Sequence, residues 1–377
     1  MTIVQEQFLE LLRSGLWGRP ADASLFQGDV DWKAIFRTAK EQTVQIIVAD
    51  GMETLPRSLT PKKQTIYKVA IKRTTNSLTH KFLNTTINRI TNALNAAGIP
   101  SVLLKGQGVA QNYLNPESRM CGDIDIYVGM ENFERACDVL MQIEPDRSEL
   151  GLETDRHRHI NIDGAEIEVH HTIDHIRSSR QNGILELWGK NQMPLASLPA
   201  TTHIWRNDDT DICLPPHTYN AFFILHHGVR HFISEGVGLR HICDWIMYIH
   251  KHHEKIDAAE LSNIINALNM MQVWQEFSIL ATQVLGLPVE ELPIALKKTA
   301  SKKTHRFLQE IFYSGNFGKY ATEKINITEK NVIKRKWHNF WFQTSRLFKL
   351  HKIFPAYTRA FAWGWFTNAL YRFFTRQ

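Results

Sequence analysis

The chain has few cysteines for its 377 residues. It contains four, and none forms a C-x-x-C pair: Cys121, Cys137, Cys213 and Cys243. This spacing is unlike a zinc ribbon, a thioredoxin-like redox motif or a disulfide framework. We therefore expect reduced thiols in a cytoplasmic protein that is large enough to form a core without covalent cross-links.

Long apolar runs are also missing. The stretches that come nearest, such as AFAWGWF at 360–366, are much shorter than the roughly 20 residues that a membrane-spanning helix needs. The N-terminal segment MTIVQEQFLELLRSGLW contains acidic residues. It does not have the basic start and following apolar run of a secretory signal. The sequence predicts no transmembrane segment.

Two common nucleotide-binding motifs are absent. GQGVAQ at 106–111 lacks the third glycine of the dinucleotide fingerprint, and no G-x-x-x-x-G-K phosphate loop occurs. If the chain binds a nucleotide, it must do so through another arrangement.

The last part of the chain lacks acidic residues. Residues 330–377 contain ten Lys or Arg, fourteen aromatics and no Asp or Glu, so the net charge of +6 resides there and the remainder is slightly acidic. Mixed basic and aromatic residues can bind a polyanion such as nucleic acid, or lie on a membrane surface. We favour a pair of amphipathic helices whose aromatics complete the core.

The periodicity of apolar residues divides the chain into three regions. Residues 1–98 have helical spacing, with a helix beginning at Asp31 and a long one from about Lys63 to Ala97. Short alternating runs follow over 99–214, and helical spacing returns over 215–377. The sequence predicts an α+β protein whose small mixed-sheet core is flanked by N-terminal helices and a C-terminal helical domain.

Acidic residues alternate with apolar ones in the central region. In DIDIYV at 123–128, Asp123 and Asp125 share one face of the predicted strand. Asp163-Gly164 lies between two alternating runs and predicts a two-residue hairpin. In the second strand of that hairpin, Glu166, Glu168 and His170 share a face. A second hairpin is expected to turn at Asp208-Asp209.

The aspartate pair suggests a site for metal and phosphate. Carboxylates are hard ligands suited to Mg²⁺, which usually also binds phosphate oxygens. Upstream, SVLLK at 101–105 predicts a strand that ends at a glycine turn opening a short helix. Helix N-termini favour phosphate. A third carboxylate on a neighbouring strand would complete the site, and Glu168 is the preferred candidate over Glu166.

These residues resemble a known family. The Lys105-Gly106 step, Arg119, the pair Asp123 and Asp125, and Glu168-Val-His170 resemble the bacterial uncharacterised nucleotidyltransferase family of the polymerase-β-like superfamily. The likeness extends over most of the chain and is strongest over 100–245, where Arg240 and Asp244 also match.

The resemblance implies transfer of NMP from an NTP to a hydroxyl acceptor, with release of pyrophosphate. Asp123, Asp125 and Glu168 would bind Mg²⁺ or Mn²⁺, with Glu168 as a possible base. The phosphates would be contacted by a set of five residues around the turn: Lys105, Gly106, Gln107, Gly108 and Arg119. Gln107 stands where the superfamily usually has serine.

Several alternatives stay open. The fold could be a catalytically decayed nucleotide- or nucleic-acid-binding module, or a toxin-like transferase acting on tRNA. The acceptor could be a small molecule, a protein or tRNA, and ATP is only the default donor. His227 and His231 have metal-ligand spacing on a helix. We expect these two to pack the helical domain against the catalytic cleft or to contact substrate, and the role of His226 stays open.

Overall fold

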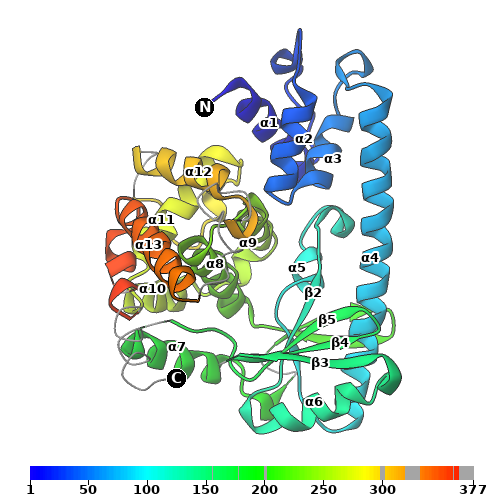
Figure 1. The fold of residues 1–377 in the computed structure, drawn as a ribbon, viewed down its shortest axis with the longest axis vertical. Coiled ribbons are helices and arrows are strands. Elements are labelled where there is room, and N and C mark those ends of the chain that lie inside the picture. Colours follow the sequence, from blue (N-terminus) through cyan, green and yellow to red (C-terminus); the bar gives the residue numbers. More distant parts are fainter. Residues whose placement is uncertain are drawn as a thin grey trace. The chain divides into compact units, whose positions relative to one another are not determined.

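The computed structural model describes residues 1–154, 156–176, 178–198, 202–297, 302–318, 332–359 and 361–364. They form two compact units. The sheet unit comprises Pro61–His175 and Leu185–Ala221, and the helical unit comprises Met1–Thr60, Ile176–Ile184 and Phe222–Gln377. The predicted α+β class is confirmed (Figure 1).

The sheet unit contains the strands and three helices. Its elements are α4 (Lys63–Ala96), β1 (Val102–Leu103), α5 (Gln107–Ala110), β2 (Asp123–Tyr127), α6 (Phe133–Met141), β3 (Ser148–Glu153), β4 (His157–Ile162), β5 (Ala165–His170), β6 (His203–Asn207) and β7 (Thr210–Leu214). Five strands form one mixed sheet in the order β1-β2-β5-β4-β3, and β6 and β7 pair separately. Within the sheet, β2 and β5 are parallel neighbours and the other pairs are antiparallel.

Both predicted hairpins are confirmed. Asp163 and Gly164 have φ of 52° and 87° and join β4 to β5. Positive φ at both central residues is the type I′ geometry that matches strand twist. Asp208 also has positive φ, and β6 pairs with β7 across it. The sequence had not indicated β3, which carries the acidic, exposed stretch SELGLE.

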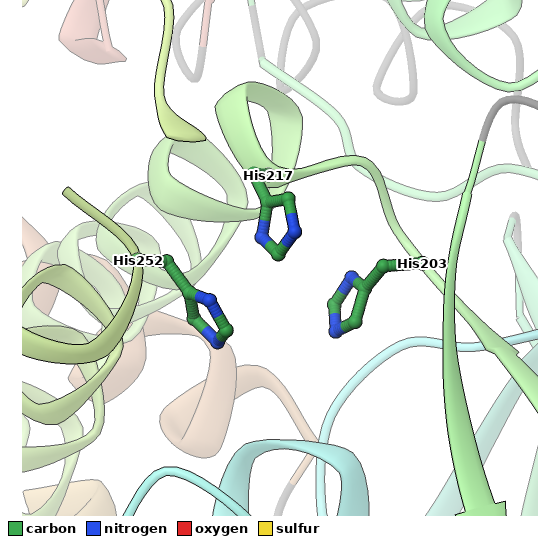
Figure 2. Close-up of side chains that lie close together, drawn as sticks. All are labelled: His203, His217 and His252. Carbon is green, nitrogen blue, oxygen red and sulfur yellow. The ribbon is translucent and has the colours of Figure 1, made fainter. Parts of the chain in front are cut away.

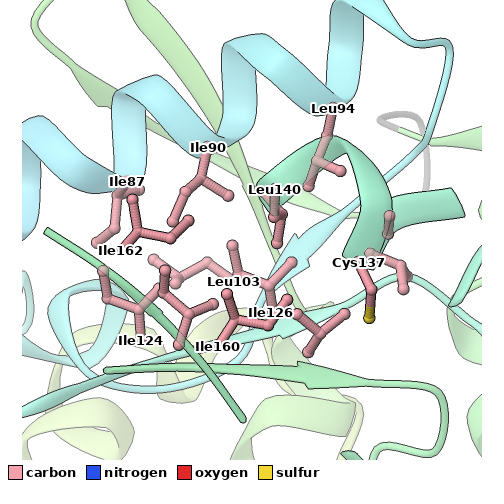
Figure 3. Close-up of a cluster of buried hydrophobic side chains, with 14 of the residues drawn as sticks. Ile87, Ile90, Leu94, Leu103, Ile124, Ile126, Cys137, Leu140, Ile160 and Ile162 are labelled. Carbon is pink, nitrogen blue, oxygen red and sulfur yellow. The ribbon is translucent and has the colours of Figure 1, made fainter. Parts of the chain in front are cut away.

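One face of the sheet carries the core of this unit. Apolar side chains of α4, α6, the sheet and β7 meet there, among them Ile87, Ile90, Leu94, Leu103, Ile124, Ile126, Leu140, Ile160 and Ile162 (Figure 3). The long helix α4 begins and ends where the sequence predicted. It belongs with the sheet because its last turns bury Leu83, Ile87 and Ile90 against this cluster. The opposite face of the sheet is left to polar residues.

The helical unit is built from the two ends of the chain. Its helices are α1 (Ile3–Trp17), α2 (Trp32–Glu41), α3 (Gln45–Glu53), α9 (Leu239–His252), α10 (Ala258–Ala267), α11 (Met271–Ile279), α12 (Lys302–Ser314) and α13 (Val332–His351). Helices α7 (Ser179–Gln192) and α8 (His217–Ser234) contribute residues to both units. The division therefore differs from the expected boundaries at 98 and 214, because α4 joins the sheet and residues 1–60 join the C-terminal helices.

The predicted helix that begins at Asp31 is interrupted. Asp31 does cap α2, since its side chain accepts the Ala34 amide at 2.8 Å. The chain then breaks at Thr43, whose φ is 56°, before α3 begins. A non-glycine residue in the left-handed region cannot continue a helix, so the segment forms two helices.

Part of the C-terminal basic region packs into the core. Leu350 in α13 and Phe354, four residues further along, are both fully buried. The buried Arg346 pairs with Glu310 at 2.9 Å and donates to the Ile233 carbonyl at 3.1 Å. These contacts agree with a core-completing role for this part. Residues 319–331, 360 and 365–377 lie outside the described residues.

Glu10 gives the helical unit a buried charge with several partners. Its carboxylate accepts from Arg13 at 2.6 and 3.0 Å, from Arg19 at 3.0 Å and from the Asp22 amide at 3.0 Å. Burial alone would raise the pKa of Glu10, but the hydrogen bonds from Arg19 and Arg13 outweigh it and lower the pKa.

We predict that Glu10→Gln destabilises the protein by about 2 kcal/mol at neutral pH, because the charged hydrogen bonds are lost. A lowered folded-state pKa gives stability that is present above the unfolded value and lost as pH falls through the folded one. The difference between wild type and variant should therefore shrink below about pH 4.5. Urea unfolding at several pH values tests this. Glu290→Gln, at an exposed position, is the control and should change little.

Candidate active site

On the polar face of the sheet, strand register decides which side chains lie next to one another. β2, β5 and β4 lie side by side, so each row contains one residue from each strand. The rows are Asp123–Glu166–Asn161, Asp125–Glu168–His159 and Tyr127–His170–His157. Side chains directly opposite one another on adjacent strands have Cβ atoms about 5 Å apart. The parallel pairing of β2 with β5 thus brings Asp125 beside Glu168.

Asp125 is the buried centre of this face. It is 1% exposed, and its Oδ1 is 2.7 Å from Lys105 Nζ and 3.0 Å from His170 Nε2. Its Oδ2 is buried and has no hydrogen-bond partner among the described residues. A carboxylate oxygen without a partner in a buried position is costly unless a ligand or cation satisfies it. Asp125 therefore offers an oxygen to a bound group.

Lys105 lies among the three predicted acids. It lies two residues after β1 and directly follows Leu104, whose amide donates to the Asp125 carbonyl at 3.0 Å. Burial alone would lower the pKa of Lys105, but the charges of Asp125, Asp123 and Glu168 outweigh it and raise the pKa. Burial alone would likewise raise the pKa of Asp125, and the Lys105 and His170 charges hold it well below its usual range. Both groups are ionised at neutral pH.

Glu168 is surrounded by three histidines. Its Oε2 lies 3.3 Å from His170 Nε2 and 3.7 Å from His157 Nε2, and its Oε1 lies 3.9 Å from His159 Nε2. Burial opposes protonation of His170, but hydrogen bonds to Asp125 and Glu168 outweigh it and raise the pKa of His170. Burial lowers the pKa of His157 to about 4, so His157 is neutral at pH 7.

Asp123 and Glu166 lie at the outer row of the face. They are paired across β2 and β5, and both are exposed. Asp123 still acts on Lys105 through its charge. The structure therefore gathers Asp123, Asp125 and Glu168 around one lysine.

The turn after Lys105 requires glycine. Gly106 has φ 58° and ψ −118°, and a Cβ there would come within 3.1 Å of the Asp123 carbonyl oxygen. This backbone region is accessible essentially to glycine alone. The next residue, Gln107, is 1% exposed, and its amide oxygen and nitrogen have no partner among the described residues. The turn thus places an amide with free hydrogen-bonding capacity beside β2.

Comparison with known protein families places the chain in one of them. Residues 28–286 match the sequence profile of a family described as an uncharacterised nucleotidyltransferase. The chain belongs to this family. No curated protein matches this chain.

One similar solved structure is an antigenic nucleotidyltransferase-like protein from Paracoccidioides brasiliensis. It is 14% identical, with a TM-score of 0.33, and the match covers 54% of this chain and 92% of that one. We base the fold class of this nucleotidyltransferase-family chain on its own strands and helices.

Gly108 has a structural reason for its identity. A Cβ on Gly108 would meet the Leu214 side chain closer than 3.0 Å, and the Gly108 amide bonds the Lys105 carbonyl at 3.2 Å. Glycine at this position permits close packing. The helix α5 has a single turn, so it cannot supply the aligned dipole that we expected to attract phosphate.

Arg119 is directed towards a thiol. It is 6% exposed, and its Nη1 lies 2.8 Å from Cys121 Sγ. His80 Nε2 lies 2.7 Å from the Arg119 carbonyl. Burial alone would raise the pKa of Cys121, but the Arg119 charge and the His80 hydrogen bond lower it. The predicted phosphate contact of Arg119 therefore competes with a described contact to Cys121.

Sequence reasoning overlooked His157 and His159. Counting back from the Asp163-Gly164 turn pairs His159 with Glu168 and His157 with His170, as the register shows. The hairpin signal together with the alternating RHRHINI stretch could therefore have placed both histidines beside the third acid.

The other histidines of interest lie elsewhere. In the sheet unit, His203 and His217 stack with ring centroids 4.4 Å apart (Figure 2). In the helical unit, the fully buried His226 contacts the Tyr357 hydroxyl at 3.1 Å. The rings of His227 and His231 are 4.5 Å apart. Within the described residues, these two join no group of three close metal-ligating side chains.

Among the described helices, none is both long and apolar enough to cross a bilayer.

Proposed function

We propose that the chain is a nucleotidyltransferase of the polymerase-β-like type that transfers NMP from an NTP, with ATP as the default donor, to a hydroxyl acceptor. The observation that carries the proposal is the convergence of Asp123, Asp125 and Glu168 around Lys105, directly before a turn that requires glycine. A decayed binding module would not need all three acids to face one point.

The acids fit a divalent cation. Asp125 has a buried oxygen without a partner, and Glu168 lies on the adjacent strand in the same row. These two and Asp123 would hold Mg²⁺ or Mn²⁺, which when bound neutralises charge on the triphosphate and polarises its phosphorus.

The chain's own residues would prepare the reacting groups. Lys105 keeps Asp125 ionised and places an ammonium group beside the Gly106 turn. In the reaction, the acceptor oxygen forms a bond to the α-phosphorus, the bond to the β-phosphate oxygen breaks, and pyrophosphate leaves. Glu168 is positioned to receive the acceptor's proton. His170 orients Asp125 and Glu168 through one nitrogen.

We predict that an NTP raises the unfolding temperature only when Mg²⁺ is present. A ligand at 100 times its Kd stabilises the folded state by about 2.7 kcal/mol. Thermal unfolding with each of four NTPs, with and without Mg²⁺, tests this and identifies the donor base. Equal shifts without the metal, or no shift with any NTP, would count against the proposed site.

A further inference from the structure

Four metal-binding side chains from β4 and β5 converge at one end of the polar face. Three of them, His157, Glu168 and His170, place ligand atoms within 4.8 Å of one another. His159 lies next to this group rather than within it, because its Nε2 is 3.1 Å from His157 Nε2 and 3.9 Å from Glu168 Oε1. The hairpin register sets this group, since His157 faces His170 and His159 faces Glu168.

The distances between donor atoms match those around a small cation. Metal–nitrogen bonds of about 2.0–2.1 Å in a tetrahedron separate neighbouring donors by about 3.3 Å. The observed separations are 3.1 Å for His157–His159, 3.3 Å for His170–Glu168 and 3.7 Å for His157–Glu168. Small side-chain rotations would equalise them.

The surroundings also favour a metal at this position. Two imidazole Nε2 atoms at 3.1 Å can satisfy each other only if one of them donates its proton, whereas a cation accepts lone pairs from both. His157 and His170 are only 8% and 5% exposed, so packing restricts the positions of their ring nitrogens. Asp125 adds an unpartnered buried oxygen in the neighbouring row.

The ligand atoms of this group differ from those of the acidic set, which is Asp123, Asp125 and Glu168. Mg²⁺ prefers oxygen ligands, while imidazole nitrogen suits Zn²⁺ and neighbouring transition metals. A site with three imidazoles and one carboxylate therefore selects a different metal from the one expected at Asp123 and Asp125. Both Glu168 oxygens face histidines, Oε2 towards His157 and Oε1 towards His159, so Glu168 can join these rings in holding a metal.

We propose that His157, His159, Glu168 and His170 form a binding site for a transition-metal dication of the Zn²⁺ class. The proposal does not depend on nucleotidyl transfer, because it concerns metal affinity in the absence of nucleotide. It shares Glu168 with the acids to which we assign catalysis, and His170 with the hydrogen bonds that orient them.

Co²⁺ titration of the chelator-treated full-length protein tests this site, with visible absorption and calorimetry as readouts. Co²⁺ is expected to bind at one site, with absorption bands indicating nitrogen ligation, and Zn²⁺ should displace it. His159→Ala should weaken binding at least about 100-fold, as loss of a ligand should exceed the 10–100-fold cost of losing an outer partner. Its side chain is 39% exposed, so this variant should fold.

His305→Ala removes an exposed histidine of the helical unit and should leave Co²⁺ binding unchanged. Circular dichroism and thermal unfolding in chelator check that each variant is folded. Unchanged Co²⁺ affinity in His159→Ala would overturn the proposal. So would loss of binding in Asp125→Asn alone, because the metal would then lie on the acids.

The same variants separate this proposal from the proposed transfer. If His159→Ala loses Co²⁺ binding but keeps the Mg²⁺-dependent NTP shift, both proposals stand. If wild type binds no Co²⁺ yet shows the NTP shift, the histidine site alone is wrong.

Discussion

Asp125→Asn is expected to weaken Mg²⁺–NTP binding about 100-fold or more, because it removes a buried charged ligand rather than an outer partner. A ligand present at 100 times the wild-type Kd would then be near the variant's Kd. Its stabilisation would fall from about 2.7 to about 0.4 kcal/mol. The Mg²⁺-dependent shift in unfolding temperature should nearly disappear, and transfer of labelled NMP should disappear with it.

The variant also changes the protein without ligand. Lys105 Nζ and Asp125 Oδ1 are 2.7 Å apart and mostly buried. Removing one partner of such a pair costs about 3 kcal/mol because the other charge stays buried. Binding must therefore be measured at a temperature where circular dichroism shows that both proteins are folded.

Glu166→Gln is the matched control. Like Asp125→Asn, it removes one negative charge from the polar face of the sheet. Glu166 is exposed and lies on β5, two residues before Glu168. The control should keep the Mg²⁺-dependent shift. If Glu166→Gln also lost the shift, Glu166 would replace Glu168 as the proposed third acid. If Asp125→Asn kept the shift, the proposed site would be wrong.

Gly15→Ala and Gly51→Ala are each expected to destabilise the protein by about 3 kcal/mol or more, at the upper end of the cost of overpacking. Helices α1 and α3 cross at these two glycines. A Cβ on Gly15 would overlap the Ile47 carbonyl oxygen, and one on Gly51 would overlap the Leu11 carbonyl oxygen, both closer than 3.0 Å. Backbone cannot move aside as a side chain can, so the helices must separate.

Gly183→Ala shows what the same substitution does without a clash. Gly183 is an exposed residue of α7, and a Cβ there meets nothing within 4 Å. Alanine should stabilise the helix by about 0.5–1 kcal/mol. Urea unfolding followed by circular dichroism compares the three variants. A change within about 0.5 kcal/mol for Gly15→Ala, as for an ordinary surface substitution, would show that the two helices do not cross so closely.

The double variant probes the same contact. The first alanine already separates α1 from α3, so the second should cost less than it does alone. Additive costs would indicate two independent sites. The side chains around the crossing also depend on its closeness, because Ser14 Oγ and Thr54 Oγ1 are 3.0 Å apart.

The local features of the fold could be predicted from the sequence. Asp163-Gly164 specified the β4–β5 hairpin through its tolerance of positive φ, and the alternation around Asp125 assigned the acids to one face. The helix from Lys63 was also correctly bounded. Periodicity and turn chemistry depend on residues near one another in the chain, so they can be read without knowing what packs on them.

Only the tertiary structure decided which strands and helices are neighbours. The pairing of Asp125 with Glu168 requires β2 and β5 to be adjacent and parallel, although they are 43 residues apart. The tertiary structure also decided that Arg119 contacts Cys121, that α5 has one turn, and that α1 meets α3 through two glycines. Such pairings depend on which apolar faces bury each other, and that choice involves the whole core rather than any local pattern.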